Sequence, residues 1–309
     1  MNGNLRVWWL GCVFLVPCIV LAQGQDSQPY ERDLMVVGTL LQGSFDNANQ
    51  SYFDRRGKRS VRHGRIHQTV EKVALDNLGD QVFLVSGYRN GKTDESTQPQ
   101  LWALTSDSDT ASVKMRMWLL DGEVSAEKLP PAASLGRVRH CDLYWRREAA
   151  QFRASSSESC DLALPVEAVI SDKQLWTIYA PEGEDFQMHR VRQFECYADI
   201  PGVGGGRDEP FERYEGFKVH DQGGEAWFTA KSGREFGISL FLVDWPINNY
   251  DGIFARDSMV VYFSERMDGE TKEHGYAFTV PEADRVGINL KWVLVNCYMN
   301  SNKVETPFM

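Results

Sequence analysis

Residues 112–120 read Ser-Val-Lys-Met-Arg-Met-Trp-Leu-Leu. Because successive side chains of a β-strand point to opposite faces, this alternation predicts a strand with one buried side and one solvent-facing side. The predicted core face carries Val113, Met115, Met117 and Leu119, and the predicted wet face carries Lys114, Arg116 and Trp118. A strand of this kind covers a hydrophobic core on one side only, so the stretch places the chain in the β class.

Similar short runs recur on both sides of this stretch, separated by turn signals such as Asn90-Gly91. The predicted strands are 65–75, 81–88, 101–105, 141–147, 151–155, 168–171, 175–179 and 189–200. Many short strands joined by turns predict an antiparallel sandwich or barrel. A small barrel closes around its own side chains or around one small ligand.

The two ends of the chain differ from this pattern. Residues 30–54 have the spacing of a helix that Gly43 interrupts, and a second short helix is predicted over 46–53. Strands are predicted again after about residue 211, at 226–230, 236–244, 259–264, 276–280 and 290–298. We therefore predict a barrel domain over 30–200, a glycine-rich linker over 201–210, and a β-rich domain or extension over 211–309.

The composition is that of a folded acidic protein. Hydrophobic residues make up 42% and charged residues 25%, and the formal net charge is -10. A nucleic-acid-binding protein needs clustered positive charge to displace counterions, so no nucleic-acid partner is predicted. The one basic run, 55–59, is interpreted as a solvated segment.

The N-terminus indicates export. An apolar run from Val7 to Ala22 follows a single charge at Arg6, and Val20-Leu21-Ala22 fits a signal-peptidase site. We predict a cleaved signal peptide over 1–22 and a secreted or periplasmic protein, with no membrane span after cleavage. A signal anchor, or a lipoprotein modified at Cys18, is the alternative.

The cysteine count agrees with an oxidising compartment. Four cysteines remain after residue 22, and they allow three pairings. We favour Cys141–Cys160, which closes a short loop between neighbouring strands, and Cys196–Cys297, which ties the last strand to the middle of the chain. A structural zinc site is the competing interpretation, but the cysteine spacings are too wide for its paired motifs.

The chain has neither the Gly-x-Ser-x-Gly elbow of a hydrolase nor the His-Glu-x-x-His helix of a zinc protease. His63 and His67 lie four residues apart, and either hydrogen-bonded histidines or a metal pair would fit that spacing. We favour hydrogen-bonded histidines and predict no metal site. No catalytic residue is assigned, and Asn49 in Asn-Gln-Ser is a glycosylation acceptor only in a suitable host.

Two motifs carry a family resemblance. Residues 41–50 read Leu-Gln-Gly-Ser-Phe-Asp-Asn-Ala-Asn-Gln, which has the form Gly-x-Phe-(Asp/Ser)-Asn-x-x-Gln at Gly43, Phe45, Asn47 and Gln50. The second motif consists of Cys141, Asp142, Trp145, Arg147, Phe152 and Cys160. In this order and spacing they resemble the opening helix and the late cysteine hairpin of CpcT/CpeT-type chromophore lyases, over roughly residues 34–200.

The resemblance implies a lipocalin-like (calycin-type) antiparallel β-barrel with N-terminal helices, here followed by a β-rich C-terminal extension. It also implies an open-chain tetrapyrrole (bilin) as ligand and its thioether attachment to a protein cysteine. Arg65 and Arg147 would then suit the propionates, and Tyr144 and Trp145 the flat conjugated face. The alternative roles are Trp145 in the core and Arg147 as a partner of Asp142.

The third strand departs from the family pattern. It reads Gln98-Pro99-Gln100-Leu101-Trp102, without the two arginines that the family commonly carries there. Bilin lyase activity is therefore one hypothesis, with the acceptor protein unknown. A non-catalytic secreted lipocalin-like protein that binds a flat lipophilic ligand is the alternative, and an interaction protein with a filled barrel is a third. The sequence also leaves the oligomeric state open, a homodimer included.

Overall fold

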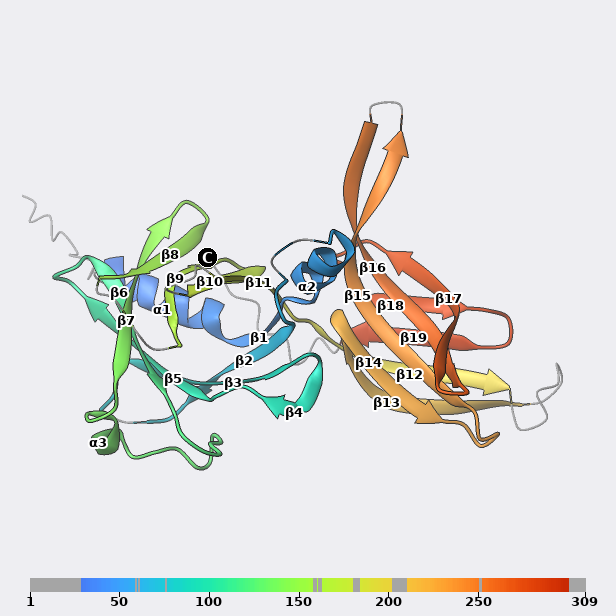
Figure 1. Ribbon diagram of the computed structural model, residues 1–309, viewed down its shortest axis with the longest axis horizontal. Coiled ribbons are helices and arrows are strands. Elements are labelled where there is room, and N and C mark those ends of the chain that lie inside the picture. The colour runs from blue at the N-terminus through green and yellow to red at the C-terminus, as the bar shows by residue number, and fades with distance from the viewer. Residues whose placement is uncertain are drawn as a thin grey trace, which may run out of the picture.

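The structure is a computed structural model that describes residues 29–58, 60, 62–75, 77–157, 160, 163–179, 184–201, 210–249 and 252–299. The predicted signal peptide and most of the predicted linker, 202–209, lie outside the described residues. The described chain is mostly β, as predicted, and forms two units that each have a core (Figure 1).

The first unit is a closed antiparallel barrel (Figure 1). Its sheet has 11 strands in the order β2-β1-β11-β10-β9-β8-β7-β6-β5-β3-β4, and pairing of β2 with β3 closes the ring and leaves β4 at its edge. The strands are β1 Gly43–Asp46, β2 Ile66–Val73, β3 Gln81–Arg89, β4 Lys92–Ser96, β5 Gln100–Asp107, β6 Ser112–Leu119, β7 His140–Glu148, β8 Gln151–Ser156, β9 Pro165–Ile170, β10 Gln174–Tyr179 and β11 Glu184–Arg190. The predicted barrel is confirmed.

A helix fills the barrel. α1 (Pro29–Leu41) contacts β5 and β6 on one wall and β9 on another. Its buried side chains Leu34, Val37, Leu40 and Leu41 join one cluster with residues of the barrel strands, among them Phe45, Phe83 and Trp145. Burying an aliphatic side chain of this size contributes about 1.5–3 kcal/mol. The barrel interior is therefore a packed core around a helix.

The alternation over residues 112–120 is largely confirmed. Val113, Met115 and Met117 are buried in the barrel core, and Leu119 packs against it. Trp118 is the exception: it is only 4% exposed, although the pattern placed it on the wet face. It belongs to a smaller apolar cluster on the outer side of β3, β5 and β6, which the short helix α3 (Ala132–Leu135) helps to cover through Leu135.

Two local predictions need correction. Gly43 was expected to interrupt the helical stretch, with a second helix over 46–53. Instead Gly43–Asp46 forms β1, and helix α2 spans Ala48–Arg56. Gly43 has a φ of +119°, which side chains rarely allow, and β1 pairs with both β2 and β11. Residues 189–200, predicted as one strand, are divided between two strands. The chain leaves the barrel at Arg192, which bonds Asp221 through its backbone N–H and its guanidinium.

The second unit consists of two four-stranded antiparallel sheets, in the orders β13-β12-β19-β18 and β14-β15-β16-β17. Side chains from both sheets form one core, so the unit is a β-sandwich. The strands are β12 Gln193–Pro201, β13 Phe211–His220, β14 Gln222–Thr229, β15 Glu235–Asn249, β16 Gly252–Met267, β17 Glu270–Thr279, β18 Arg285–Asn289 and β19 Leu294–Met299.

The unit boundary lies at residues 191–192 and not in the glycine-rich stretch that was predicted to separate the domains. β12, assigned to the barrel by sequence, pairs with β13 and β19 and supplies Phe194 and Cys196 to the sandwich core. A local strand pattern cannot show which sheet a strand joins, because pairing partners lie far along the chain.

Both predicted disulfides are present. Cys141 of β7 is bonded to Cys160, and Cys196 of β12 is bonded to Cys297 of β19, its register partner. Each unit therefore contains one covalent cross-link. Of the helices in the described part of the chain, none has the length and apolar character that a membrane span needs.

Candidate functional site: a basic pocket on the barrel wall

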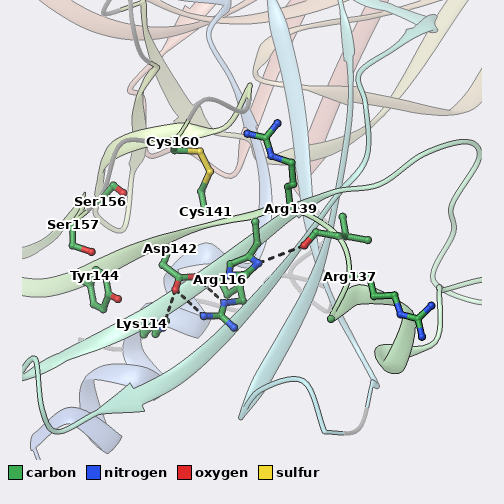
Figure 2. Close-up of a pocket in the computed structure, with 13 residues that line it drawn as sticks. Lys114, Arg116, Arg137, Arg139, Cys141, Asp142, Tyr144, Ser156, Ser157 and Cys160 are labelled. Carbon is green, nitrogen blue, oxygen red and sulfur yellow. Dashed lines mark hydrogen bonds and ion pairs between the residues drawn. A yellow bond between two sulfur atoms is a disulfide. The ribbon is translucent and has the colours of Figure 1, made fainter.

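A pocket of about 580 Å³ lies on the outer wall of the barrel (Figure 2). Lys114 and Arg116 of β6 form one side, because the two-residue period of the strand directs both away from the core. Asp142 and Tyr144 of β7 lie directly across from Arg116 and Lys114 in the strand pairing. The alternation that builds the core thus also lines the pocket with polar side chains.

The chain leading into β7 and the chain at the end of β8 complete the pocket. The first contributes Arg137, Arg139 and the first residue of β7, His140, all exposed. The second contributes the last residue of β8, Ser156, followed by Ser157 and Cys160, and the Cys141–Cys160 disulfide holds it against β7. Figure 2 shows this disulfide and Arg139 on one side of Asp142, with Tyr144 and the two serines on another.

An ion triad forms the centre of the pocket. Arg116 donates from Nε to Oδ1 of Asp142 at 2.8 Å and from Nη2 to Oδ2 at 2.9 Å. The Nζ of Lys114 lies 2.8 Å from the same Oδ2. A guanidinium has five N–H donors and an ammonium has three, so both cations keep donors for a further acceptor.

The electrostatics keep all three groups charged near neutral pH. Burial alone would raise the pKa of Asp142, but the hydrogen bonds and charges of Arg116 and Lys114 outweigh burial and hold that pKa below its ordinary value. The hydrogen bond to Asp142 raises the pKa of Arg116. Burial acts to lower the pKa of Lys114, and its bond to Asp142 outweighs this and raises it.

Among the described residues that line the pocket, cationic side chains outnumber carboxylates. Lys114, Arg116, Arg137 and Arg139 are cationic and Asp142 carries the carboxylate, in a chain whose formal net charge is -10. A second hollow, of about 450 Å³ on the outer face of β8 to β10, is lined by one arginine and one glutamate, Arg153 and Glu167. The basic pocket is therefore suited to an anion, whereas the second hollow is electrically balanced.

The four predicted ligand contacts do not lie together. Tyr144 lines the basic pocket, but Trp145, the next residue, points inward and is 1% exposed in the barrel core. Arg147 pairs with Asp33 of α1 at 2.8 Å, not with Asp142, and its guanidinium lies over the ring of Phe152. Arg65 lies at the junction of the two units, where it bonds Asp46.

The first family motif forms a hydrogen-bond network at one end of the barrel. Asn47, the residue before α2, accepts from the N–H of Ile66 at 2.7 Å and donates to Gln50. Gln50 in turn donates to the carbonyl of Asp185 and accepts from the N–H of Gln187. The motif thus ties β1, α2, β2 and β11 together.

Three further motif residues, Gly43, Phe45 and Phe152, are also structural. Phe45 and Phe152 are both fully buried in the barrel core. A Cβ at Gly43 would lie 2.9 Å from Nη1 of Arg190, whose guanidinium covers the ring of Phe45. Core packing explains the two phenylalanines, and the positive φ and the close approach of Arg190 explain the glycine.

His63 and His67 do not form a pair in the structure. Nδ1 of His63 lies 2.6 Å from Asp54, whereas Nδ1 of His67 lies 3.1 Å from Asp46. Arg137, Arg139 and His140 were not predicted as pocket residues. A signal for them exists, because the run Gly136-Arg-Val-Arg-His140 stands immediately before the disulfide cysteine Cys141.

No protein-family model matches the chain. No curated protein matches it in sequence either. The resemblance to the CpcT/CpeT-type lyases therefore rests on its motifs, and both membership of that family and lyase activity stay predictions.

Proposed function

We propose that this chain is a non-catalytic, exported binding protein that holds an anionic ligand in the basic pocket on the barrel wall. The observation that carries the proposal is the ion triad of that pocket: Arg116 and Lys114 both bond the carboxylate of Asp142 and keep donors for a further acceptor. The volume of about 580 Å³ falls in the range of about 300–1,000 Å³ that is usual for small-molecule sites. The two disulfides suit an exported protein.

The ligand class follows from the donors. Arg116 and Lys114 present N–H groups side by side on one strand, a geometry that suits a carboxylate, sulfate or phosphate. Asp142 neutralises one charge, holds both side chains in place and reduces the mobility that a ligand would otherwise have to remove. Tyr144 offers a ring beside Lys114, whose Nζ lies 5.7 Å from the ring centroid.

A bilin remains one candidate, now bound outside the barrel. Its two propionates would meet the cations, and its conjugated face would meet Tyr144. The barrel interior is less suited to a flat lipophile, because α1 and the surrounding side chains occupy it. Thioether formation is not part of this proposal.

The test is a titration of the disulfide-bonded protein with biliverdin, followed by absorbance. Biliverdin dimethyl ester is the matched probe, because esterification removes both carboxylates and keeps the conjugated system. We expect saturable binding of the diacid that weakens at high salt, and at least tenfold weaker binding of the ester. Sodium sulfate should compete with the diacid.

Two variants locate the site. Arg116→Gln/Arg137→Gln removes two pocket cations and should weaken biliverdin binding about tenfold or more. Arg147→Gln removes the same kind of charge from the barrel at a residue outside the pocket, and it should leave binding unchanged. Equal binding of diacid and ester, or equal loss in both variants, would contradict the proposal.

A further inference from the structure

The junction between the barrel and the sandwich brings together three metal-ligating side chains. Asp46 ends β1, His67 lies opposite it on β2, and His220 ends β13 of the sandwich. One ligand atom of each residue lies within 4.8 Å of the others. His67 and Asp46 are only 6% and 0% exposed, and His220 is partly buried.

The rings are held in place by their neighbours. His67 stacks on Tyr88 with ring centroids 4.6 Å apart, and the His220 ring lies 5.1 Å from that of His67. Gly224 leaves space for His220, because a Cβ there would lie 2.7 Å from its Cδ2. The three side chains therefore converge without a rearrangement of the backbone.

The hydrogen bonding leaves one nitrogen of the cluster without a partner. Nδ1 of His220 is buried and has no hydrogen-bond partner within the described part of the chain. A buried polar atom of this kind costs free energy unless something binds it. Nδ1 of His67 lies 3.1 Å from Oδ2 of Asp46, within hydrogen-bond distance. A bound cation would replace the hydrogen between these two atoms.

We propose that Asp46, His67 and His220 form a binding site for a divalent first-row cation, with Zn²⁺ as the best fit. Two imidazoles and one carboxylate are a ligand set that Zn²⁺ favours, and water would complete a tetrahedral shell. Tetrahedral zinc bonds of about 2.0–2.2 Å place ligand atoms about 3.4 Å apart. His67 and Asp46 already lie that close, at 3.1 Å, whereas a pair at the 4.8 Å limit would have to approach by about 1.4 Å. The metal would join the two units.

Arg65 holds Asp46 in place and weakens cation binding at this site. It donates to Asp46 from Nε and Nη2, and its Nη2 also donates to the carbonyl oxygens of Gln222 and Gly223 at 2.7 and 3.1 Å. This bridge holds the sandwich against the barrel when no metal is bound. The guanidinium also repels a cation, so the site should bind Zn²⁺ reversibly.

The test uses the exported, tag-free protein, dialysed against a chelator and then titrated with Zn²⁺. We expect about one zinc per chain by elemental analysis and a rise in Tm that grows with zinc concentration. Co²⁺, used as a spectroscopic probe, should give the intense visible absorption of a tetrahedral site.

Two variants test the ligand assignment. His220→Gln should weaken Zn²⁺ binding at least tenfold and abolish the zinc-dependent rise in Tm, with the Tm of the metal-free protein showing that the variant is folded. The control is His189→Gln, because His189 lies opposite Asp46 on β11 but is not one of the three ligands.

Three outcomes would overturn the proposal: no zinc uptake by the folded protein, uptake that His220→Gln leaves unchanged, or uptake that His189→Gln reduces equally. The biliverdin titration uses other residues, so the two proposals can fail separately.

Discussion

The barrel and the sandwich fill their cores in different ways. The sandwich core consists of side chains from its two sheets, with the rings of Phe236 and Phe263 stacked 5.2 Å apart and Trp292 beside them. The barrel core also contains the apolar face of helix α1, in addition to the side chains of its own strands. Sheets of a sandwich pack about 10 Å apart, which side chains can span, whereas a ring of this many strands encloses more space.

This difference has a consequence for function. A barrel filled by a helix offers its outer wall and its ends to ligands, and the basic pocket and the junction cluster lie at those places. The proposed binding residues of the pocket accordingly lie on the polar side of the strand alternation. Three experiments test how far the two units differ.

The largest effect is expected from the disulfides. The Cys196–Cys297 bond spans 101 residues and Cys141–Cys160 spans 19. Because a longer loop loses more entropy when it is closed, the chain-entropy estimate is about 4.7 kcal/mol for a loop near 100 residues and about 3 kcal/mol for a short one. We therefore expect Cys196→Ala/Cys297→Ala to lower the urea midpoint more than Cys141→Ala/Cys160→Ala. If Cys141→Ala/Cys160→Ala lowered the urea midpoint more, the barrel would depend on its disulfide more strongly than the sandwich does.

The next effect concerns the helix inside the barrel. Leu40 is fully buried on α1, and Leu40→Ala should cost about 2–5 kcal/mol of unfolding free energy, because it leaves a cavity that the closed sheet cannot collapse to fill. Arg32→Ala on the exposed side of α1 should change stability by less than about 0.5 kcal/mol. Urea unfolding measures both variants, and equal small effects would show that α1 is not part of the core.

The smallest effect is a pH dependence in the sandwich. Bonds to Arg234 at 2.7 and 2.8 Å and to His274 at 2.7 Å lower the pKa of Glu265 to about 2, in spite of its burial. Because the folded pKa lies below the ordinary value of a glutamate, the stabilisation is present above about pH 5 and is lost as the pH falls toward 2.

Glu265→Gln should therefore cost about 1–3 kcal/mol at pH 7 and progressively less between pH 5 and pH 2. Urea unfolding of both proteins across this range measures the difference. A cost that does not change with pH would mean that the carboxylate charge does not stabilise the sandwich. The control is Glu235→Gln, because Glu235 pairs with Arg266 at a more exposed position.

Some elements of this fold were predictable from the sequence because they depend on the spacing of apolar residues along a short stretch of chain. The alternation at Val113, Met115 and Met117 marked a half-buried strand, and the spacing of Leu34, Val37 and Leu41 marked a helix. Trp118 was misplaced because residues outside the strand, Leu135 among them, cover it, and the alternation within one strand cannot show this. Similarly, Gly43–Asp46 becomes a strand because β2 and β11 pair with it.

The candidate site was predictable only in part. The polar face of β6 and the neighbouring cysteine were visible in the sequence, and so was Asp142. Their convergence depends on the pairing of β6 with β7, which places Asp142 opposite Arg116. The resemblance-based ligand set failed to converge for the same reason, because Tyr144 and Trp145 are neighbours in the chain and point to opposite faces of one strand.

The sequence by itself determined the β class, the helical start and, through an even number of cysteines, the cross-linked character of the chain. Only the tertiary structure decided that a helix fills the barrel, that the sandwich begins at β12, and that Asp46 and His67 meet His220. The physical reason is the distance along the chain over which each kind of interaction acts. Periodicity and turns act over a few residues, whereas Arg65 and Gln222 are 157 residues apart and become neighbours only when both sheets are complete.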